Sequence, residues 1–162
     1  MQLYFLSAHF IAMFKLLSLQ LSTKQKLIYI YTKLYLLAGK EIHESMKTDL
    51  SYLREMSGGN TELVLEMIGI FNNQVVEFAS EMDDLLKSEN YDLLGKLAHK
   101  AKSSVSIMGL TDLALELKQL ENIARERKNP ESYPVIVEKF KQETAEAVKE
   151  LNIVAKNIEL YF

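Results

Sequence analysis

The chain has no cysteine, and it holds only 2 prolines and 6 glycines among 162 residues. Without cysteine there is no disulfide framework, no thiolate nucleophile and no cysteine-ligated metal site. This composition is compatible with a reducing compartment, and we expect a cytoplasmic protein. The scarcity of helix-breaking residues favours helices. No stretch shows the clear alternation of apolar and polar residues over five or more positions that is typical of strands.

The sequence also lacks the motifs of several common activities. It contains no GxxxxGK phosphate-binding loop, which argues against a nucleotide site and a self-sufficient kinase. It contains no Glu-x-x-His pair, which a di-iron site in a helical bundle requires. From Met46 onward, 14 Lys plus Arg stand against 20 Asp plus Glu. Because affinity for phosphate backbones needs clustered cations, we expect no nucleic-acid partner.

Residues 1–38 differ from the rest, because they are rich in Leu, Tyr, Phe and Ile and carry four lysines but no acidic residue. Their longest uncharged stretch, Met1 to Phe14, is shorter than the about 20 residues that span a bilayer, and it does not resemble a signal peptide. Three interpretations remain: a helix pair packed on the body, a membrane-surface anchor, or a misplaced start codon with translation beginning at Met46. The composition resembles translated AT-rich non-coding sequence, which favours the third.

We therefore divide the chain into an extension and linker, residues 1–45, and one domain, residues 46–162. His9 and His43 lie in the first part and receive no role. In the domain, helical spacing of apolar residues predicts one short helix and four longer ones. The predicted ranges are Met46–Met56, Thr61 to about Lys87, a helix capped by Asn90 that runs to about Met108, a helix capped by Thr111 that runs to about Lys128, and Pro134 to about Leu160.

Short loops between long amphipathic helices imply antiparallel neighbours. The predicted fold is therefore all-α, an up-down-up-down four-helix bundle with a short preceding helix and a hydrophobic N-terminal extension. The methionine and aromatic positions of residues 61–87 recur at helical spacing, and we interpret them as core rather than as a cofactor pocket.

One histidine stands out in residues 97–110, which read LAHKAKSSVSIMGL. At about 100° of turn per residue, the apolar residues fall in one arc, and His99 falls on roughly the opposite side with Ser103 and Ser106 nearby. A histidine in such a position is most often an ordinary surface residue. Here, however, Lys102 follows three residues later, and such residues are neighbours on a helix. Lys102 could screen the charge of a phosphoryl group on the imidazole.

The segment resembles the signature of histidine-containing phosphotransfer (HPt) domains of two-component phosphorelays. That signature is a histidine, any residue, an apolar residue, a lysine and a small residue, followed by further small residues and a glycine. In this sequence His99 is followed by Ala101, Lys102 and Ser103, with Gly109 at the tenth position. Ala101 stands where a larger aliphatic residue is usual and Ser103 where glycine is usual, but both are small enough for a partner to approach closely.

Residues 46–162 also match this family in length and helix order, so the resemblance covers the whole predicted bundle. It implies a phosphocarrier rather than an enzyme, in which His99 accepts a phosphoryl group from a receiver-domain aspartate and passes it to another receiver. A neutral imidazole suits this role near pH 7, because its ordinary pKa is about 6.5. No compact acidic cluster lies beside His99. We therefore expect Mg²⁺ to come with the receiver, and no cofactor or metal site in this chain.

The partners that this resemblance implies are response-regulator receiver domains and a hybrid histidine kinase. Lys96, Lys100 and Lys102 form a small basic patch in an otherwise acidic body, which suits docking to an acidic receiver pocket. Ser103 and Ser106 complete the expected contact surface, and we expect a monomer. Two alternatives remain, a helical adaptor that binds receivers without carrying phosphate and a fragment of a larger hybrid kinase. The intact histidine–lysine pair favours a phosphocarrier over an adaptor.

Overall fold

A computed structural model describes residues 27–28, 30–31 and 46–162. The chain divides into two compact units, residues 1–45 and residues 46–162. In the first unit, the four described residues are helical and exposed. The predictions made for Met1 to Phe14, His9 and His43 lie outside the described residues. Within the described part of the chain, no helix combines the length and apolar character needed to cross a membrane.

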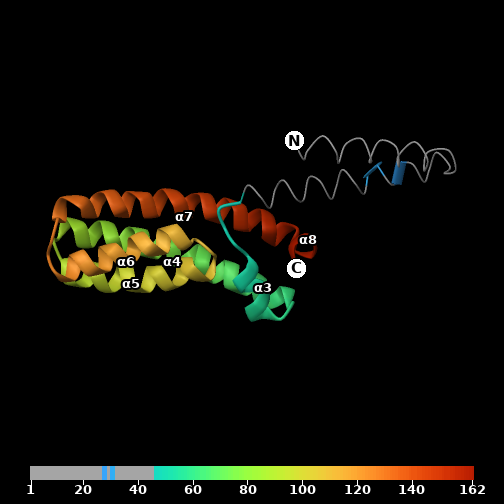
Figure 1. The fold of residues 1–162 in the computed structure, drawn as a ribbon, viewed down its shortest axis with the longest axis horizontal. Helices are drawn as coiled ribbons and strands as arrows, with labels where there is room; N and C mark the ends of the chain where they lie inside the picture. The colour runs from blue at the N-terminus through green and yellow to red at the C-terminus, as the bar shows by residue number, and fades with distance from the viewer. Residues whose placement is uncertain (1–26, 29, 32–45) are drawn as a thin grey trace, which may run out of the picture. The chain divides into compact units, whose positions relative to one another are not determined.

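Residues 46–162 form four long helices that follow one short helix (Figure 1). The long helices are α4 (Thr61–Lys87), α5 (Tyr91–Ile107), α6 (Thr111–Arg125) and α7 (Tyr133–Lys156). The short elements are α3 (Ser51–Ser57), the 3₁₀ turn η1 (Pro130–Ser132) and α8 (Ile158–Tyr161). Helix α5 packs against α4 and α6, and α7 packs against the same two helices from the other side. The predicted all-α, up-down-up-down bundle with a short preceding helix is confirmed.

Local sequence signals set most of the helix ends. The side chains of Asn60 and Asn90 accept hydrogen bonds from the backbone N–H groups of Leu63 and Leu93, at 3.1 and 3.4 Å, as N-caps do. The prediction that Thr111 caps α6 is wrong, because Thr111 is the first helical residue and no side chain caps this helix. The turn before α6 is closed instead by backbone hydrogen bonds, which the N–H groups of Gly109 and Leu110 donate to the carbonyl oxygens of Ser106 and Val105. Such bonds are typical of a helix that ends at a residue with a left-handed conformation.

The two ends of the domain also differ from the prediction. Residues 46–50 are not helical, because the carboxylate of Glu150 on α7 accepts hydrogen bonds from the backbone N–H groups of Lys47 and Thr48 at 3.0–3.1 Å. These bonds hold the backbone in a non-helical path until Ser51. At the other end, α7 stops at Lys156, and α8 forms a separate short helix.

The core lies between the four long helices and extends under α3. It contains large apolar side chains that are at most 1% exposed, among them Leu53, Phe71, Met82, Leu94, Leu117, Tyr133 and Phe140. Tyr133 closes one end of the bundle, where its hydroxyl donates to the carbonyl oxygens of Ile123 and Lys128 at 2.9 and 2.8 Å. Not every apolar position of α4 is core. Leu63 and Ile70 are 37% and 48% exposed, because they lie beside the buried stripe of the helix.

Gly109 joins α5 to α6 in a conformation that suits glycine, with φ at +73°. A β-carbon added there would lie 2.3 Å from the carbonyl oxygen of Asp49. We expect Gly109→Ala to lower the free energy of unfolding by at least about 2 kcal/mol, from left-handed strain and the backbone clash together. Urea unfolding followed by circular dichroism measures this change.

Gly69 provides the matched control, because it lies inside α4 and a β-carbon there would meet nothing within 4 Å. Gly69→Ala should raise stability by roughly 0.5–1 kcal/mol, the helix-propensity difference alone. If Gly109→Ala were as stable as the wild type, the close approach of the turn to Asp49 would not contribute to the fold.

The domain boundary can be tested by truncation. A chain of residues 46–162 should fold and melt near the full chain, because the bundle closes its own core and keeps the bonds from Glu150 to residues 47 and 48. A chain of residues 50–162 loses those bonds and should be less stable by about 2 kcal/mol or more. Thermal unfolding of both chains makes the comparison. Aggregation or early melting of the chain of residues 46–162 would show that residues 1–45 belong to the core.

Candidate functional site

His99 lies in the middle of α5, on the side that faces α6, and its side chain is 54% exposed. The prediction that it points away from the apolar arc agrees with this exposure. However, one edge of the ring is covered by α6. This close approach of the helices is possible because Gly95, one turn earlier, has no side chain. A β-carbon on Gly95 would lie 3.3 Å from the carbonyl oxygen of Glu121.

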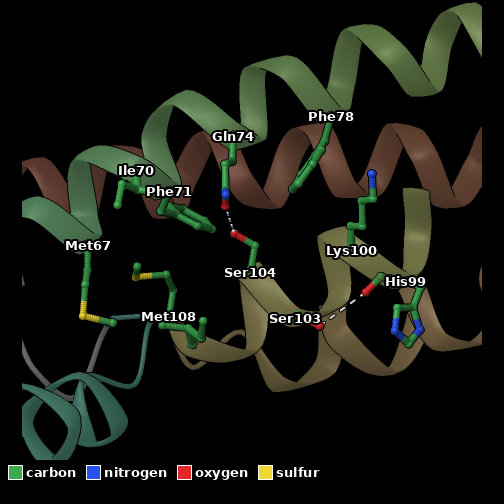
Figure 2. A pocket seen from close by; sticks show the side chains of 11 residues that line it. Met67, Ile70, Phe71, Gln74, Phe78, His99, Lys100, Ser103, Ser104 and Met108 are labelled. Carbon is green, nitrogen blue, oxygen red and sulfur yellow. Dashed lines mark hydrogen bonds between the residues drawn. The ribbon is translucent and has the colours of Figure 1, made fainter. Parts of the chain in front are cut away.

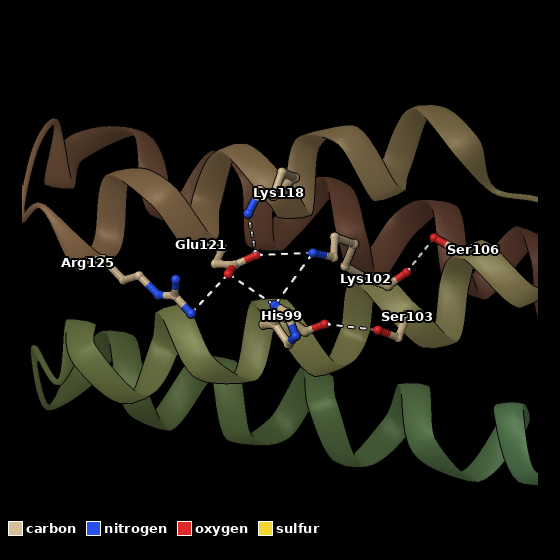
Figure 3. Close-up of polar contacts among 7 residues, drawn as sticks. All are labelled: His99, Lys102, Ser103, Ser106, Lys118, Glu121 and Arg125. Carbon is tan, nitrogen blue, oxygen red and sulfur yellow. Dashed lines mark hydrogen bonds and ion pairs between the residues drawn. The ribbon is translucent and has the colours of Figure 1, made fainter.

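Glu121 of α6 is the centre of a polar cluster that the helix periodicity did not identify. Its carboxylate is 1% exposed and is contacted by four side chains, three through hydrogen bonds and one through an ion pair alone (Figure 3). Oxygen Oε1 accepts a hydrogen bond from His99 Nδ1 and forms an ion pair with Arg125 Nη2, both at 3.0 Å. Oxygen Oε2 accepts from Lys102 Nζ at 3.2 Å and from Lys118 Nζ at 3.3 Å. We call these five residues the Glu121 cluster.

The cluster sets the charge of the glutamate and the tautomer of the histidine. Burial by itself would raise the pKa of Glu121, but the hydrogen bonds from Lys102, His99 and Lys118 outweigh it and lower that pKa to about 2. An ionised carboxylate only accepts hydrogen bonds. Nδ1 of His99 therefore carries the hydrogen, and the lone pair of the neutral imidazole is on Nε2. This second nitrogen is directed away from Glu121 (Figure 3).

On the other side of His99, α4 and α5 border an open apolar groove (Figure 2). Its lining residues are Met67, Ile70, Phe71, Gln74, Phe78, His99, Lys100, Ser103, Ser104, Ile107 and Met108. The only internal polar contact drawn across it is the hydrogen bond that Ser104 Oγ donates to Gln74 Oε1 at 2.6 Å. Several methionine and aromatic positions predicted to be core thus also form a surface beside His99.

The structure separates the predicted site residues into two groups. Lys100 and Ser103 line the groove together with His99. Lys102 lies on the α6 side, where its ammonium contacts Glu121 and comes within 3.5 Å of His99 Nδ1. Both predicted contact serines use their hydroxyls locally, since Ser103 donates to the carbonyl of His99 and Ser106 to that of Lys102. Lys96 is exposed but does not line the groove.

A comparison with protein families matches residues 66–152 to the Hpt domain. The match covers more than half of the chain and includes α5 and the whole Glu121 cluster. The chain belongs to the Hpt domain family. Hpt domains are phosphocarrier modules, not catalytic enzymes, and they act with response regulators and kinases in two-component phosphorelays. Neither the curated proteins nor the solved structures gave a match.

The sequence held a signal for Glu121 that the prediction did not use. Leu113, Leu117, Leu120 and Ala124 form the buried apolar stripe of α6, and Glu121 follows Leu117 by four residues on the same stripe. A carboxylate at an inward position requires partners, because an unpaired buried charge is strongly unfavourable. Lys118 and Arg125 stand three residues before it and four after it, where α-helical neighbours meet. The contacts that His99 and Lys102 of α5 make with Glu121 could not be inferred from this stripe alone.

Among the described residues, no group of three or more His, Asp and Glu side chains is arranged to hold a metal ion. In this Hpt domain, Glu121 is surrounded by cations, and a divalent ion would have to displace them. The described site residues therefore place one imidazole and three cationic side chains around this carboxylate.

The depressed pKa of Glu121 predicts a specific pH dependence of stability. The folded-state pKa of about 2 lies below the ordinary value of 4.5. The ionised group therefore stabilises the fold above the ordinary pKa, and this contribution is lost as the pH falls toward 2. Glutamine cannot titrate. The stability difference between the wild type and Glu121→Gln should shrink by about 3 kcal/mol from about pH 6 to about pH 2.

Urea unfolding at a series of pH values measures this difference directly. Glu138→Gln is the matched control, because Lys141 and Gln142 also lower the pKa of that carboxyl but it is exposed on α7. The control should show a much weaker pH dependence, since solvent screens exposed pairs. A gap between wild type and Glu121→Gln that stayed constant with pH would show that Glu121 is not held as a buried anion.

Proposed function

We propose that His99 is the phosphoacceptor of this Hpt domain and that it exchanges a phosphoryl group with receiver-domain aspartates. The observation that supports this most directly is the state of the imidazole. Nδ1–H donates a hydrogen bond to a buried carboxylate at 3.0 Å, while Nε2 is directed away from Glu121 on a side chain that is 54% exposed (Figure 3). A nucleophile needs an accessible lone pair and a fixed orientation. The hydrogen bond between His99 and Glu121 fixes the orientation of the ring.

The transfer step follows from this arrangement. The Nε2 lone pair attacks the phosphorus of an aspartyl phosphate, a new N–P bond forms, and the P–O bond to the aspartate breaks so that a carboxylate leaves. The proton stays on Nδ1, and the ring gains positive charge. The Glu121 carboxylate stabilises that charge as it develops. The reverse reaction passes the phosphoryl group to a second receiver, and Mg²⁺ is expected to be bound by the receiver.

The groove and the lysines beside it are the proposed docking surface. Apolar side chains of α4 and α5 line the groove next to His99, and Lys100 and Lys96 are exposed on α5. A receiver that presents an apolar segment and an acidic phosphorylation pocket fits both features. Lys100 therefore supports docking rather than the transfer step. The proposed partners are receiver domains of response regulators and of a hybrid kinase.

His99→Gln tests the phosphoacceptor. The glutamine amide can still donate a hydrogen bond to Glu121, and substitutions at exposed positions usually change stability by no more than about 0.5 kcal/mol, so the variant should stay folded. It should take up no label from a phosphorylated receiver. The measurement is transfer of acid-labile ³²P from receivers of the same genome, with circular dichroism as the check on folding.

Acid-labile label in the His99→Gln protein would contradict the assignment. The competing possibility of an adaptor predicts a different result. In that case the wild-type protein and His99→Gln would bind receivers equally well, and neither would take up label. Binding measured by isothermal calorimetry beside the transfer assay separates the two functions.

A further inference from the structure

Lys102 is not placed to contact a phosphoryl group on Nε2. Its ammonium is 3.2 Å from Oε2 of Glu121 and 3.5 Å from Nδ1 of His99, so it faces the bonded edge of the ring. To reach a group on Nε2, Lys102 must leave Glu121. Its side chain is 23% exposed, and lysine is a flexible point charge, so the movement itself meets little hindrance.

The difficulty is the carboxylate that Lys102 would leave behind. Glu121 is 1% exposed, and removing the partner of a buried charge is strongly unfavourable. Two other cations reduce this penalty. Lys118 donates to the same oxygen as Lys102, at 3.3 Å, and Arg125 forms an ion pair with the other oxygen at 3.0 Å. Each oxygen therefore keeps a cationic partner after Lys102 has gone (Figure 3).

We propose that Lys118 and Arg125 of α6 are positioning residues for phosphoryl transfer: they hold the charge of Glu121 so that Lys102 can move from Glu121 to the phosphoryl group. This inference rests on the proposed function of His99 and adds two residues to its site. Both side chains are about half exposed, at 48% and 55%, yet their charged ends are directed to a buried anion. Neither residue is required to touch the phosphoryl group.

The proposal predicts coupling between the α6 cations and Lys102. Lys118→Gln should keep Lys102 on Glu121 and slow single-turnover transfer at saturating receiver by about threefold or more. Lys102→Ala should itself slow transfer about tenfold. In the Lys102→Ala background, Lys118→Gln should have almost no further effect, because there is no Lys102 to release. Arg125→Gln should behave in the same way. Its effect should be smaller, because Arg125 pairs with Oε1 of Glu121 whereas Lys102 contacts Oε2.

Lys128→Gln is the matched control, because Lys128 follows α6 and pairs with the exposed carboxylate of Glu126, at 2.7 Å. It should leave transfer unchanged. Urea unfolding of every variant confirms that the rates refer to folded protein. If Lys118→Gln slowed transfer equally with and without Lys102, Lys118 would act through docking or general charge, and the proposal would be overturned.

A second measurement does not depend on a receiver. Phosphoramidate can place a phosphoryl group on an imidazole, with formation of an N–P bond and departure of ammonia. Phosphorus NMR of the product then gives the pH midpoint of the phosphoryl signal, which a nearby ammonium lowers. The midpoint should be lower in the wild type than in Lys102→Ala, and Lys118→Gln should shift it toward the Lys102→Ala value.

The two measurements separate the inference from the function on which it rests. Labelling by phosphoramidate without transfer from any receiver would refute the proposed function, and the phosphorus midpoints would still decide whether Lys118 releases Lys102. If the wild type transferred phosphate and its phosphorus midpoint equalled that of Lys118→Gln, the inference would be overturned and the proposed function would stand. No phosphohistidine from either donor would overturn both.

Discussion

A buried anion determines the geometry of this domain around His99. Glu121 is almost fully removed from solvent, and burial alone would raise its pKa, but hydrogen bonds from Lys102, His99 and Lys118 lower that pKa to about 2. A charge in such a place is stable only while its partners stay close. Two of those partners come from α5 and two from α6 itself. The carboxylate therefore fixes how α5 and α6 face each other, and it selects the histidine tautomer.

His99 lies at the border between two different surfaces. Toward α6 it meets the buried carboxylate of Glu121 and the cations paired with it. Toward α4 it meets an apolar groove that has little internal bonding. This division suits a carrier that must hold its nucleophile still and also admit a partner. The chain then supplies orientation and positive charge, while the remaining chemistry is left to the proposed receiver.

The predicted cap at Asn90 was confirmed because its cause is local, whereas the predicted cap at Thr111 was wrong. Asn60 and Asn90 cap their helices because a short polar side chain can reach a backbone N–H three residues ahead. Gly109 follows α5 because the turn needs a positive φ. Predictions failed where a distant group intervened. Residues 46–50 are not helical because Glu150, about a hundred residues later, binds their backbone.

The sequence by itself determined the order of the four long helices, the exposed position of His99 and the resemblance to Hpt domains. Periodicity and motif spacing are properties of one helix at a time, so a single sequence shows them. Only the tertiary structure decided that Glu121 meets His99, that Lys102 faces this carboxylate and that α4 and α5 border a groove. These features depend on the rotation and spacing of neighbouring helices. That spacing is set by packing between helices, such as the close approach that Gly95 permits, which no single-helix pattern specifies.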